Sequence, residues 1–329
     1  MHADTYLMVL RVDYSTRSSH NALYREGHSP KSLEITAMTH CFLAQERRLP
    51  FVWSSLPQMS HIGLQSTNAL NLPRNLSSLM LGRLFRKTQN RRPPALRDGL
   101  RVYAVGDIHG RSDLLSALHR RILTDAAGHT GEKEIIYLGD YVDRGLDTQG
   151  VLDLLINEPL PGFRSTHLMG NHEQALLEFL SNTEICQSWL TFGGSATLQS
   201  YGVHFDVMQP SEDDFQALQQ ALTQRLPPDH LAFLKALQPY RQIDGYLFVH
   251  AGIRPGVALE NQTVADLFWI RGDFLSSAKD HGQIVVHGHS VAFKPEFKDN
   301  RIGIDTGAYA TGVLSCLVLE GDDRRVIHT

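Results

Sequence analysis

Five apolar segments of this sequence end in the same way, and this repetition constrains the fold more than any other feature. Each segment closes in glycine with aspartate, asparagine or histidine beside it. The endings are GDIHG at 106–110, GDYVDRG at 139–145, GNHE at 170–173, HAG at 250–252 and HGHS at 287–290. One such ending is more often a turn than a binding site. Five in order favour a shared site, because independent turns would not supply this set of side chains.

The pattern around these endings predicts an α/β fold. Apolar strands alternate with amphipathic helices three times between residues 100 and 180. The predicted strands are 100–106, 134–139 and 163–170, and the predicted helices are 112–126, 148–157 and 171–180. This alternation is typical of a parallel sheet with crossover helices, whose ligands bind at the carboxyl ends of the strands. A helical insertion follows at about 174–240, and the chain is rich in strands after it.

The amino-terminal part of the chain differs in composition from the rest. Residues 1–79 are rich in Ser, Asn and Pro without a sustained period, which predicts a disordered or dispensable extension. Met80 is then a candidate for the native start. Residues 80–99 are predicted to be a basic, solvated linker, and 100–329 the catalytic domain.

Composition excludes several functional classes. The net charge of −4 argues against bulk electrostatic binding of nucleic acid. No apolar run is long enough for a membrane-spanning helix, and no secretory signal opens the chain. Three widely spaced cysteines, Cys41, Cys186 and Cys316, fit no disulfide framework and indicate a reducing compartment. We therefore expect a cytoplasmic protein without a nucleic-acid or membrane partner; the oligomeric state is left open.

The residue types at the strand ends suit a pair of divalent metal ions. Carboxylate can bridge two ions, and nitrogen and oxygen ligands without thiolates suit Mn, Fe or Zn. Such a pair lowers the pKa of a shared water molecule. A nearby arginine can hold two phosphate oxygens, and a histidine beside a carboxylate can donate a proton.

The motifs GDIHG, GDYVDRG and GNHE, in this order and with similar gaps, resemble the signatures of the phosphoprotein phosphatase (PPP) family of calcineurin-like metallophosphoesterases. HAG and GHS resemble the later metal-histidine motifs of that family. The resemblance covers about residues 100–310, and GIDTGAYATG at 303–312 is similar to the bacterial serine/threonine protein phosphatase type. It implies the calcineurin-like metallophosphoesterase fold, with two central mixed β-sheets flanked by helices in an αββα sandwich.

The resemblance also implies roles for individual residues. Asp107 and His109 would bind the first metal, Asp140 would bridge both metals, and Asn171, His250 and His289 would bind the second. His172 would be the general acid, oriented by Asp143, with Arg144 and Arg271 as phosphate-binding arginines. Arg254 could face the substrate or could be a turn residue. The residues alone do not separate His287 from His289; family spacing favours His289 as ligand and places His287 behind it.

Together these features predict a dinuclear-metal phosphomonoesterase, with manganese as the first candidate metal and Fe or Zn as alternatives. Its first candidate substrate is phosphoserine or phosphothreonine on a phosphoprotein or phosphopeptide, attacked directly by hydroxide held on the metals. The alternative is a symmetrical dinucleoside-tetraphosphate hydrolase of the Ap4A type that uses the same site. A third hypothesis, a non-catalytic binding protein, is disfavoured because the full set of ligands is present.

Overall fold

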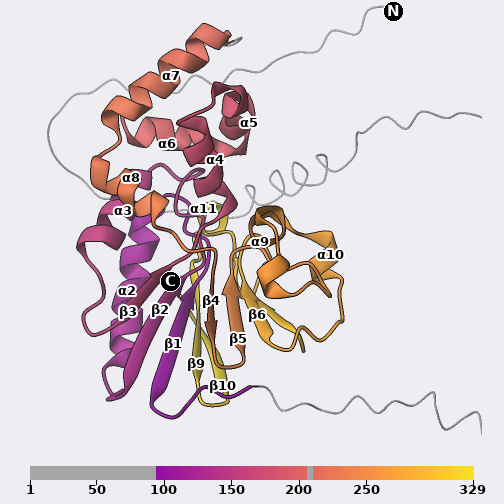
Figure 1. Ribbon diagram of the computed structural model, residues 1–329. Coiled ribbons are helices and arrows are strands. Elements are labelled where there is room, and N and C mark those ends of the chain that lie inside the picture. Colours follow the sequence, from indigo (N-terminus) through magenta and orange to yellow (C-terminus); the bar gives the residue numbers. More distant parts are fainter. Residues whose placement is uncertain (1–93, 206–209) are drawn as a thin grey trace, which may run out of the picture. The chain divides into compact units, whose positions relative to one another are not determined.

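The computed structural model describes residues 94–205 and 210–329, which form two five-stranded mixed sheets (Figure 1). The first sheet has the order β10 (Asp323–His328), β9 (Ser315–Glu320), β1 (Leu100–Val105), β2 (Glu132–Tyr137), β3 (Arg164–His167). The second has the order β4 (Tyr240–Ile243), β5 (Tyr246–Val249), β6 (Ile284–His287), β8 (Arg301–Gly303), β7 (Glu296–Phe297). Strands β1, β2 and β3 are parallel, as are β5, β6 and β8. The predicted two-sheet fold is confirmed.

Strand β1 is buried on both faces from Val102 onward, which explains why its sequence is apolar there. Val102 and Ala104 pack into the layer between the two sheets, together with Phe248 of β5. The alternate residues Tyr103 and Val105 belong to the layer under the helices of the other face. The central strand therefore contributes to two hydrophobic layers.

Helices cover the outer face of each sheet (Figure 1). On the first sheet lie α2 (Ser112–Ala126) and α3 (Thr148–Asn157), with the bounds that the sequence predicts. Near the second sheet lie α9 (Val264–Trp269) and α10 (Gly272–Leu275), which the sequence did not predict. Leu267 and Phe274 of these two short helices pack against Leu247 and Val249 of β5.

The segment 174–240 is mainly helical, as predicted, and extends beyond the carboxyl ends of the first sheet (Figure 1). Its elements are α4 (Asn171–Phe179), η2 (Thr183–Ile185), α5 (Cys186–Trp189), η3 (Leu190–Gly194), α6 (Ser195–Ser200), α7 (Glu212–Arg225) and α8 (Pro228–Lys235). The predicted helical insertion extended to about residue 240, whereas helix α8 ends at Lys235 and β4 begins at Tyr240. A short α11 (Ala308–Thr311) follows β8.

Residues 94–99 lie against the domain, although the sequence assigned them to the linker. The Leu96 amide donates a hydrogen bond to the Gly321 carbonyl at 2.8 Å, and the Leu96 side chain is buried between the sheets. The Tyr246 hydroxyl donates to the Pro94 carbonyl at 2.9 Å. Arg97 forms an ion pair of 2.9 Å with Glu132. The predictions for 1–79 and for the linker up to residue 93 lie outside the described residues.

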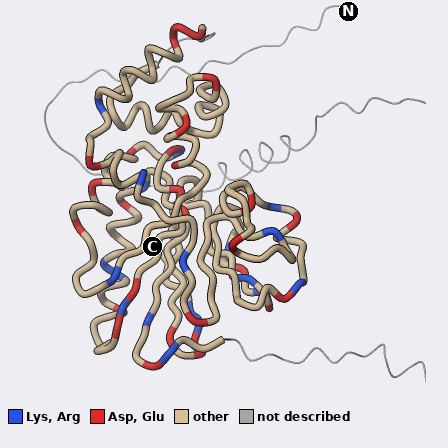
Figure 2. Tube along the Cα trace, in the orientation of Figure 1, with Lys and Arg blue, Asp and Glu red and all other residues tan. Residues whose placement is uncertain are grey.

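The described residues include charged side chains of both signs and two of the three cysteines of the chain. Lys and Arg are interspersed with Asp and Glu over both sheets in Figure 2. Cys186 and Cys316 are buried free thiols. Within 94–205 and 210–329, no helix has both the length and the apolar character needed to cross a membrane.

Candidate metal centre

Two groups of ionisable side chains meet at the carboxyl ends of the strands, and they share Asp140. One group is His109, Asp140 and His172, and the other is Asp140, His250 and His289; in each, the candidate ligand atoms lie within 4.8 Å of one another. Asp140 Oδ2 is 3.4 Å from His109 Nε2, and Asp140 Oδ1 is 3.3 Å from His250 Nε2. Each carboxylate oxygen therefore faces a different group, as a bridging ligand requires. We call Asp107, His109, Asp140, Asn171, His172, His250 and His289 the Asp140 centre.

Backbone carbonyls orient two of the histidine rings. His109 Nδ1 donates to the Val142 carbonyl at 2.9 Å, and His250 Nδ1 donates to the Leu138 carbonyl at 2.9 Å. These hydrogen bonds leave Nε2 of both rings facing Asp140 with a lone pair, which is the form that binds a metal.

The predicted ligand Asn171 lies in the second group. Its Oδ1 is 2.9 Å from His250 Nε2 and 2.8 Å from His289 Nδ1. Asn171 is the first residue of α4, so the loop that ends β3 delivers it to the centre.

Two buried polar atoms of the centre have no hydrogen-bond partner. They are Asp107 Oδ1 and His289 Nε2, although Asp107 Oδ2 accepts a hydrogen bond of 2.9 Å from the His289 amide. Burial, followed by the charges of Asp305 and Asp140, raises the pKa of Asp107 well above its usual range. Buried atoms without partners are rare, and divalent cations at the two groups would satisfy these atoms and offset the crowded negative charge. The residues present thus fit metal ions.

His172 and Asp143 form the predicted acid pair. His172 Nδ1 donates to Asp143 Oδ2 at 2.7 Å, which leaves Nε2 facing Asp140 Oδ2 at 3.9 Å. Burial alone would lower the pKa of His172, but the carboxylates of Asp140 and Asp143 more than offset it, so this pKa is raised. The ring can therefore hold a proton at Nε2 on the open side of the pair.

The helical insertion fixes Asp143 in place. Trp189 Nε1 donates to Asp143 Oδ2 at 3.0 Å, and Thr197 Oγ1 donates to Asp143 Oδ1 at 2.6 Å. The Asp143 amide in turn donates to Thr197 Oγ1 at 2.9 Å. Sequence reasoning missed Trp189 and Thr197, because neither residue lies in a motif and the contact depends on how the insertion folds back.

Arg144 lies at the centre, as predicted. Its Nη1 is 3.1 Å from His109 Nε2, and its guanidinium carbon lies 4.8 Å from the centre of the Tyr309 ring. The Arg144 amide donates to the Gly193 carbonyl at 3.1 Å. A guanidinium held in this way can bind an anionic group that enters the centre.

The other two predicted arginines lie in different surroundings. Arg271 is exposed at the start of α10, and its charge adds to burial in lowering the pKa of His250 and His289. Arg254 forms an ion pair of 2.7 Å with Asp266 and thereby ties its loop to α9. Substrate binding by Arg254 stays a prediction, and the contact gives it a structural role.

The structure separates His287 from His289. His287 Nδ1 donates to the Gly288 carbonyl at 3.0 Å, and its Nε2 lies 3.3 Å from Arg301 Nη1. Neither nitrogen of His287 belongs to the two metal-binding groups. The structure therefore places His289, rather than His287, at the centre.

Glu173 holds the loop that carries Asp140. Its buried carboxylate accepts hydrogen bonds from the amides of Asp140 at 2.8 Å, Tyr141 at 2.7 Å, Val142 at 3.1 Å and Gly170 at 3.0 Å. Burial and the charge of Asp140 raise the pKa of Glu173 to about 8, and the backbone donors oppose that rise. The sequence places Glu173 in the GNHE motif but does not reveal this role.

Five predicted site residues adopt left-handed backbone conformations. Their φ angles are 47° at His109, 53° at Asp140, 69° at Asp143, 67° at Arg144 and 60° at His289. Such angles cost about 1–3 kcal/mol each for residues other than glycine, so the surroundings must enforce them. The strained backbone thus lies at residues of the predicted site.

Two glycines of the motifs are required by close approach. A Cβ atom at Gly170 would overlap Asp140 Oδ1, and one at Gly288 would overlap Asp107 Oδ1. Glycine in GNHE and GHS thus lets the backbone pass directly against the carboxylates.

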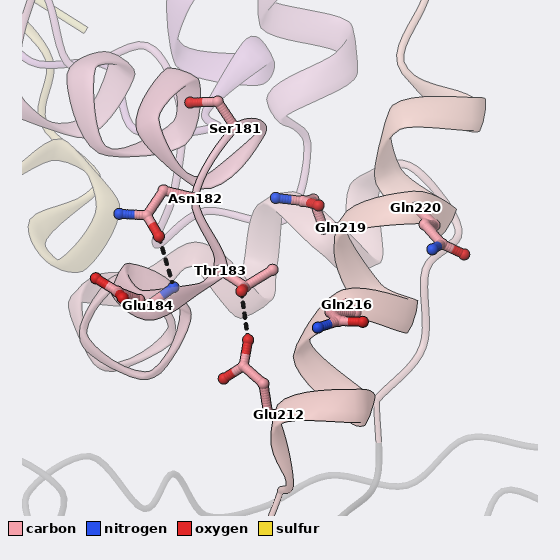
Figure 3. Close-up of a pocket in the computed structure, with 8 residues that line it drawn as sticks. All are labelled: Ser181, Asn182, Thr183, Glu184, Glu212, Gln216, Gln219 and Gln220. Carbon is pink, nitrogen blue, oxygen red and sulfur yellow. Dashed lines mark hydrogen bonds between the residues drawn. The ribbon is translucent and has the colours of Figure 1, made fainter.

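A separate polar hollow of about 450 Å³ lies between η2 and α7 (Figure 3). Its lining consists of Ser181, Asn182, Thr183, Glu184, Glu212, Gln216, Gln219 and Gln220. The Thr183 hydroxyl donates to Glu212 across one end of it. The hollow shares no residue with the Asp140 centre and offers no histidine or cysteine, so we assign the chemistry to the centre.

Comparison with known proteins agrees with the geometry. The family model described as calcineurin-like phosphoesterase matches residues 100–311, which is more than half of the chain. The asymmetrical bis(5'-nucleosyl)-tetraphosphatase PrpE of Anoxybacillus flavithermus is 24% identical over 232 residues, covering 65% of this chain and 88% of that protein. The symmetrical bis(5'-nucleosyl)-tetraphosphatase of Nitrosomonas europaea is 29% identical over 198 residues, covering 57% and 60%. A solved structure titled as a putative diadenosine tetraphosphatase has a TM-score of 0.48 at 21% identity, covering 69% and 93%.

We expect Glu173→Ala to destabilise the domain by roughly 3 kcal/mol or more. The substitution leaves several buried amides without an acceptor, and each such group costs about 1–3 kcal/mol. The free energy of unfolding in urea measures the loss. Glu178→Ala, at an exposed position of the same helix, is the control. Equal stability of the two variants would contradict the role given to Glu173.

We expect divalent metal to stabilise the protein through Asp140. A ligand at 100 times its Kd adds about 2.7 kcal/mol, so Mn²⁺ should raise the Tm of the metal-free protein. Asp140→Asn should lose most of this rise, whereas Asp213→Asn, exposed on α7, should keep it. Differential scanning calorimetry with and without Mn²⁺ measures both. A rise in Asp140→Asn as large as in the wild type would show that the metal binds elsewhere.

Proposed function

We propose that this chain, which belongs to the calcineurin-like phosphoesterase family, hydrolyses a dinucleoside tetraphosphate at the Asp140 centre. The chain is a dinuclear metallophosphoesterase, and its substrate is the part that we propose. The observation that carries the reaction class is the position of Asp140, whose two carboxylate oxygens face two different groups of ligands.

The names of the relatives and the two arginines support a dinucleotide substrate. The relatives described above are tetraphosphatases, in both asymmetrical and symmetrical forms. Arg144 and Arg271 act on opposite groups of the centre, so a chain of phosphates could meet more than one cation. For these reasons we place the dinucleotide first, although the sequence motifs alone favoured phosphoserine and phosphothreonine.

The residues of the chain have distinct parts in this reaction. Two divalent cations, when bound, would supply an activated water and withdraw charge from the phosphoryl group. His109, Asp140, Asn171, His250 and His289, with Asp107, would hold them. Arg144 binds the non-bridging phosphate oxygens and stabilises the charge that develops there. His172 carries a proton at Nε2 toward the leaving group, while Asp143 keeps the ring in that orientation.

A phosphomonoester on a protein is the second candidate substrate, and the His172–Asp143 pair is the observation that favours it. A serine or threonine alkoxide is a poor leaving group and needs a proton donor. The terminal phosphate of a departing nucleotide is a better leaving group and depends less on one. The raised pKa of His172 suits the poorer leaving group.

We expect metal-free protein reconstituted with Mn²⁺ to turn over diadenosine tetraphosphate faster than a phosphoserine peptide. Both are assayed side by side with p-nitrophenyl phosphate, and Asp140→Asn should lose about 100-fold or more in kcat. Product chromatography then defines the cut: ADP alone means symmetrical cleavage, and ATP with AMP means asymmetrical cleavage. Preference for the peptide would establish the second candidate instead. Absence of turnover with Mn, Fe and Zn would refute hydrolysis.

The role of His172 as proton donor is tested by comparing two substrates whose leaving groups differ in basicity. His172→Asn should slow phenyl phosphate hydrolysis by roughly 10²–10⁴-fold, because the phenolate needs protonation. The substitution should slow the hydrolysis of p-nitrophenyl phosphate much less, because p-nitrophenolate is a good leaving group without protonation. His204→Asn, at an exposed position of the insertion, should affect neither. An equal loss on both substrates would remove His172 as the proton donor.

A further inference from the structure

Two exposed aromatic side chains face each other beside the Asp140 centre. Phe192 is 45% exposed and Trp269 is 37% exposed, and their ring centroids are 6.2 Å apart at an interplanar angle of 57°. They come from segments far apart in the sequence: Phe192 lies in η3, and Trp269 ends α9. We call them the aromatic pair.

The aromatic pair is anchored to the elements that carry the centre. Trp269 Nε1 donates to Gln174 Oε1 at 2.8 Å, and Gln174 lies two residues after His172 on α4. On the other side, the residue after Phe192 is Gly193, whose carbonyl accepts the Arg144 amide at 3.1 Å. One member is therefore tied to the helix of the acid pair, and the other to the backbone of the arginine.

The same segments present positive charge. Arg271 lies two residues after Trp269 and is exposed at the start of α10. The guanidinium of Arg144 lies 3.1 Å from His109. A ligand that meets the aromatic pair thus has two cations near it on the side of the centre.

We propose that Phe192 and Trp269 form the subsite for one nucleobase of the substrate, with the phosphates directed toward Arg144 and Arg271. This inference rests on the proposed hydrolysis of a dinucleotide. Exposed aromatic rings near arginines suit a nucleotide, because every base has a face that stacks on an aromatic ring. The hydrogen bond to Gln174 holds the Trp269 ring before a ligand binds, which reduces the entropy lost on binding.

The experiment compares Phe192→Ala with Phe192→Trp and a matched control in the full 329-residue chain. The control is Phe297→Ala in β7, because Phe297 is 46% exposed and thus matches Phe192. Phe192→Ala should raise KM for diadenosine tetraphosphate by about 5- to 100-fold, the range of one stacked base. Phe192→Trp should restore a KM near that of the wild type, and Phe297→Ala should keep it.

Two substrates without a nucleobase distinguish the loss of base stacking from a general loss of substrate binding. The rise in KM should be much smaller for inorganic tripolyphosphate, which has phosphates but no base. An equal rise for the dinucleotide and tripolyphosphate, or for the dinucleotide and a phosphoserine peptide, would overturn the subsite. So would an unchanged KM for the dinucleotide in Phe192→Ala.

A binding measurement distinguishes failure of the subsite from failure of the proposed function. Titration of the Asp140→Asn protein with diadenosine tetraphosphate should quench tryptophan fluorescence, because Trp269 would stack with the base. The Phe192→Ala substitution in that background should weaken the titration. If the wild type shows no dinucleotide turnover but this titration behaves as expected, the proposed reaction fails and the base subsite stands. Absence of binding would overturn the subsite.

Discussion

The structure of the centre depends on one buried carboxylate that lies outside the two candidate metal-binding groups. Glu173 gathers the amides of 140–142 and of Gly170, and so joins the loop after β2 to the loop after β3. Without an acceptor in this position, these amides would be buried and unpaired. Glu173 thereby fixes the backbone position of Asp140 and the position at which α4 begins. Two of the ligand-bearing loops are thus positioned by a single side chain, and the left-handed conformation of Asp140 is enforced by the amide hydrogen bond on its own nitrogen.

The family resemblance of the motifs implied the two-sheet fold, whereas the residue pattern itself predicted most of the strands and helices and the residues that meet at the centre. The success has a physical cause: central strands must be apolar on both faces, and ligands must follow them on short side chains next to glycine. Asp107, Asp140 and His250 are each within three residues of a buried strand, so the pattern locates them without knowledge of the loops.

The remaining features depend on contacts between distant segments, which have no local pattern. Trp189 and Thr197 reach Asp143 only because the insertion folds back over the loop after β2. Residues 94–99 are polar enough to suggest a linker, but the single side chain of Leu96 fills a place between the sheets. His287 and His289 lie in the same short motif, on either side of Gly288. The left-handed turn at His289 is what directs that ring to the centre.

The segment η3 constrains how the sequence of such a protein can change in evolution. In five residues it exposes Phe192, places the Gly193 carbonyl on Arg144, and packs Gly194 against Trp189, which in turn holds Asp143. An insertion or deletion in η3 that alters the exposed surface would also displace Arg144. It would also weaken the support of Asp143, which orients the proton donor His172. A change in the length of η3 therefore alters ligand preference and reaction rate together. New specificity is reached more readily by exchanging the exposed side chain at 192 than by inserting or deleting residues beside it.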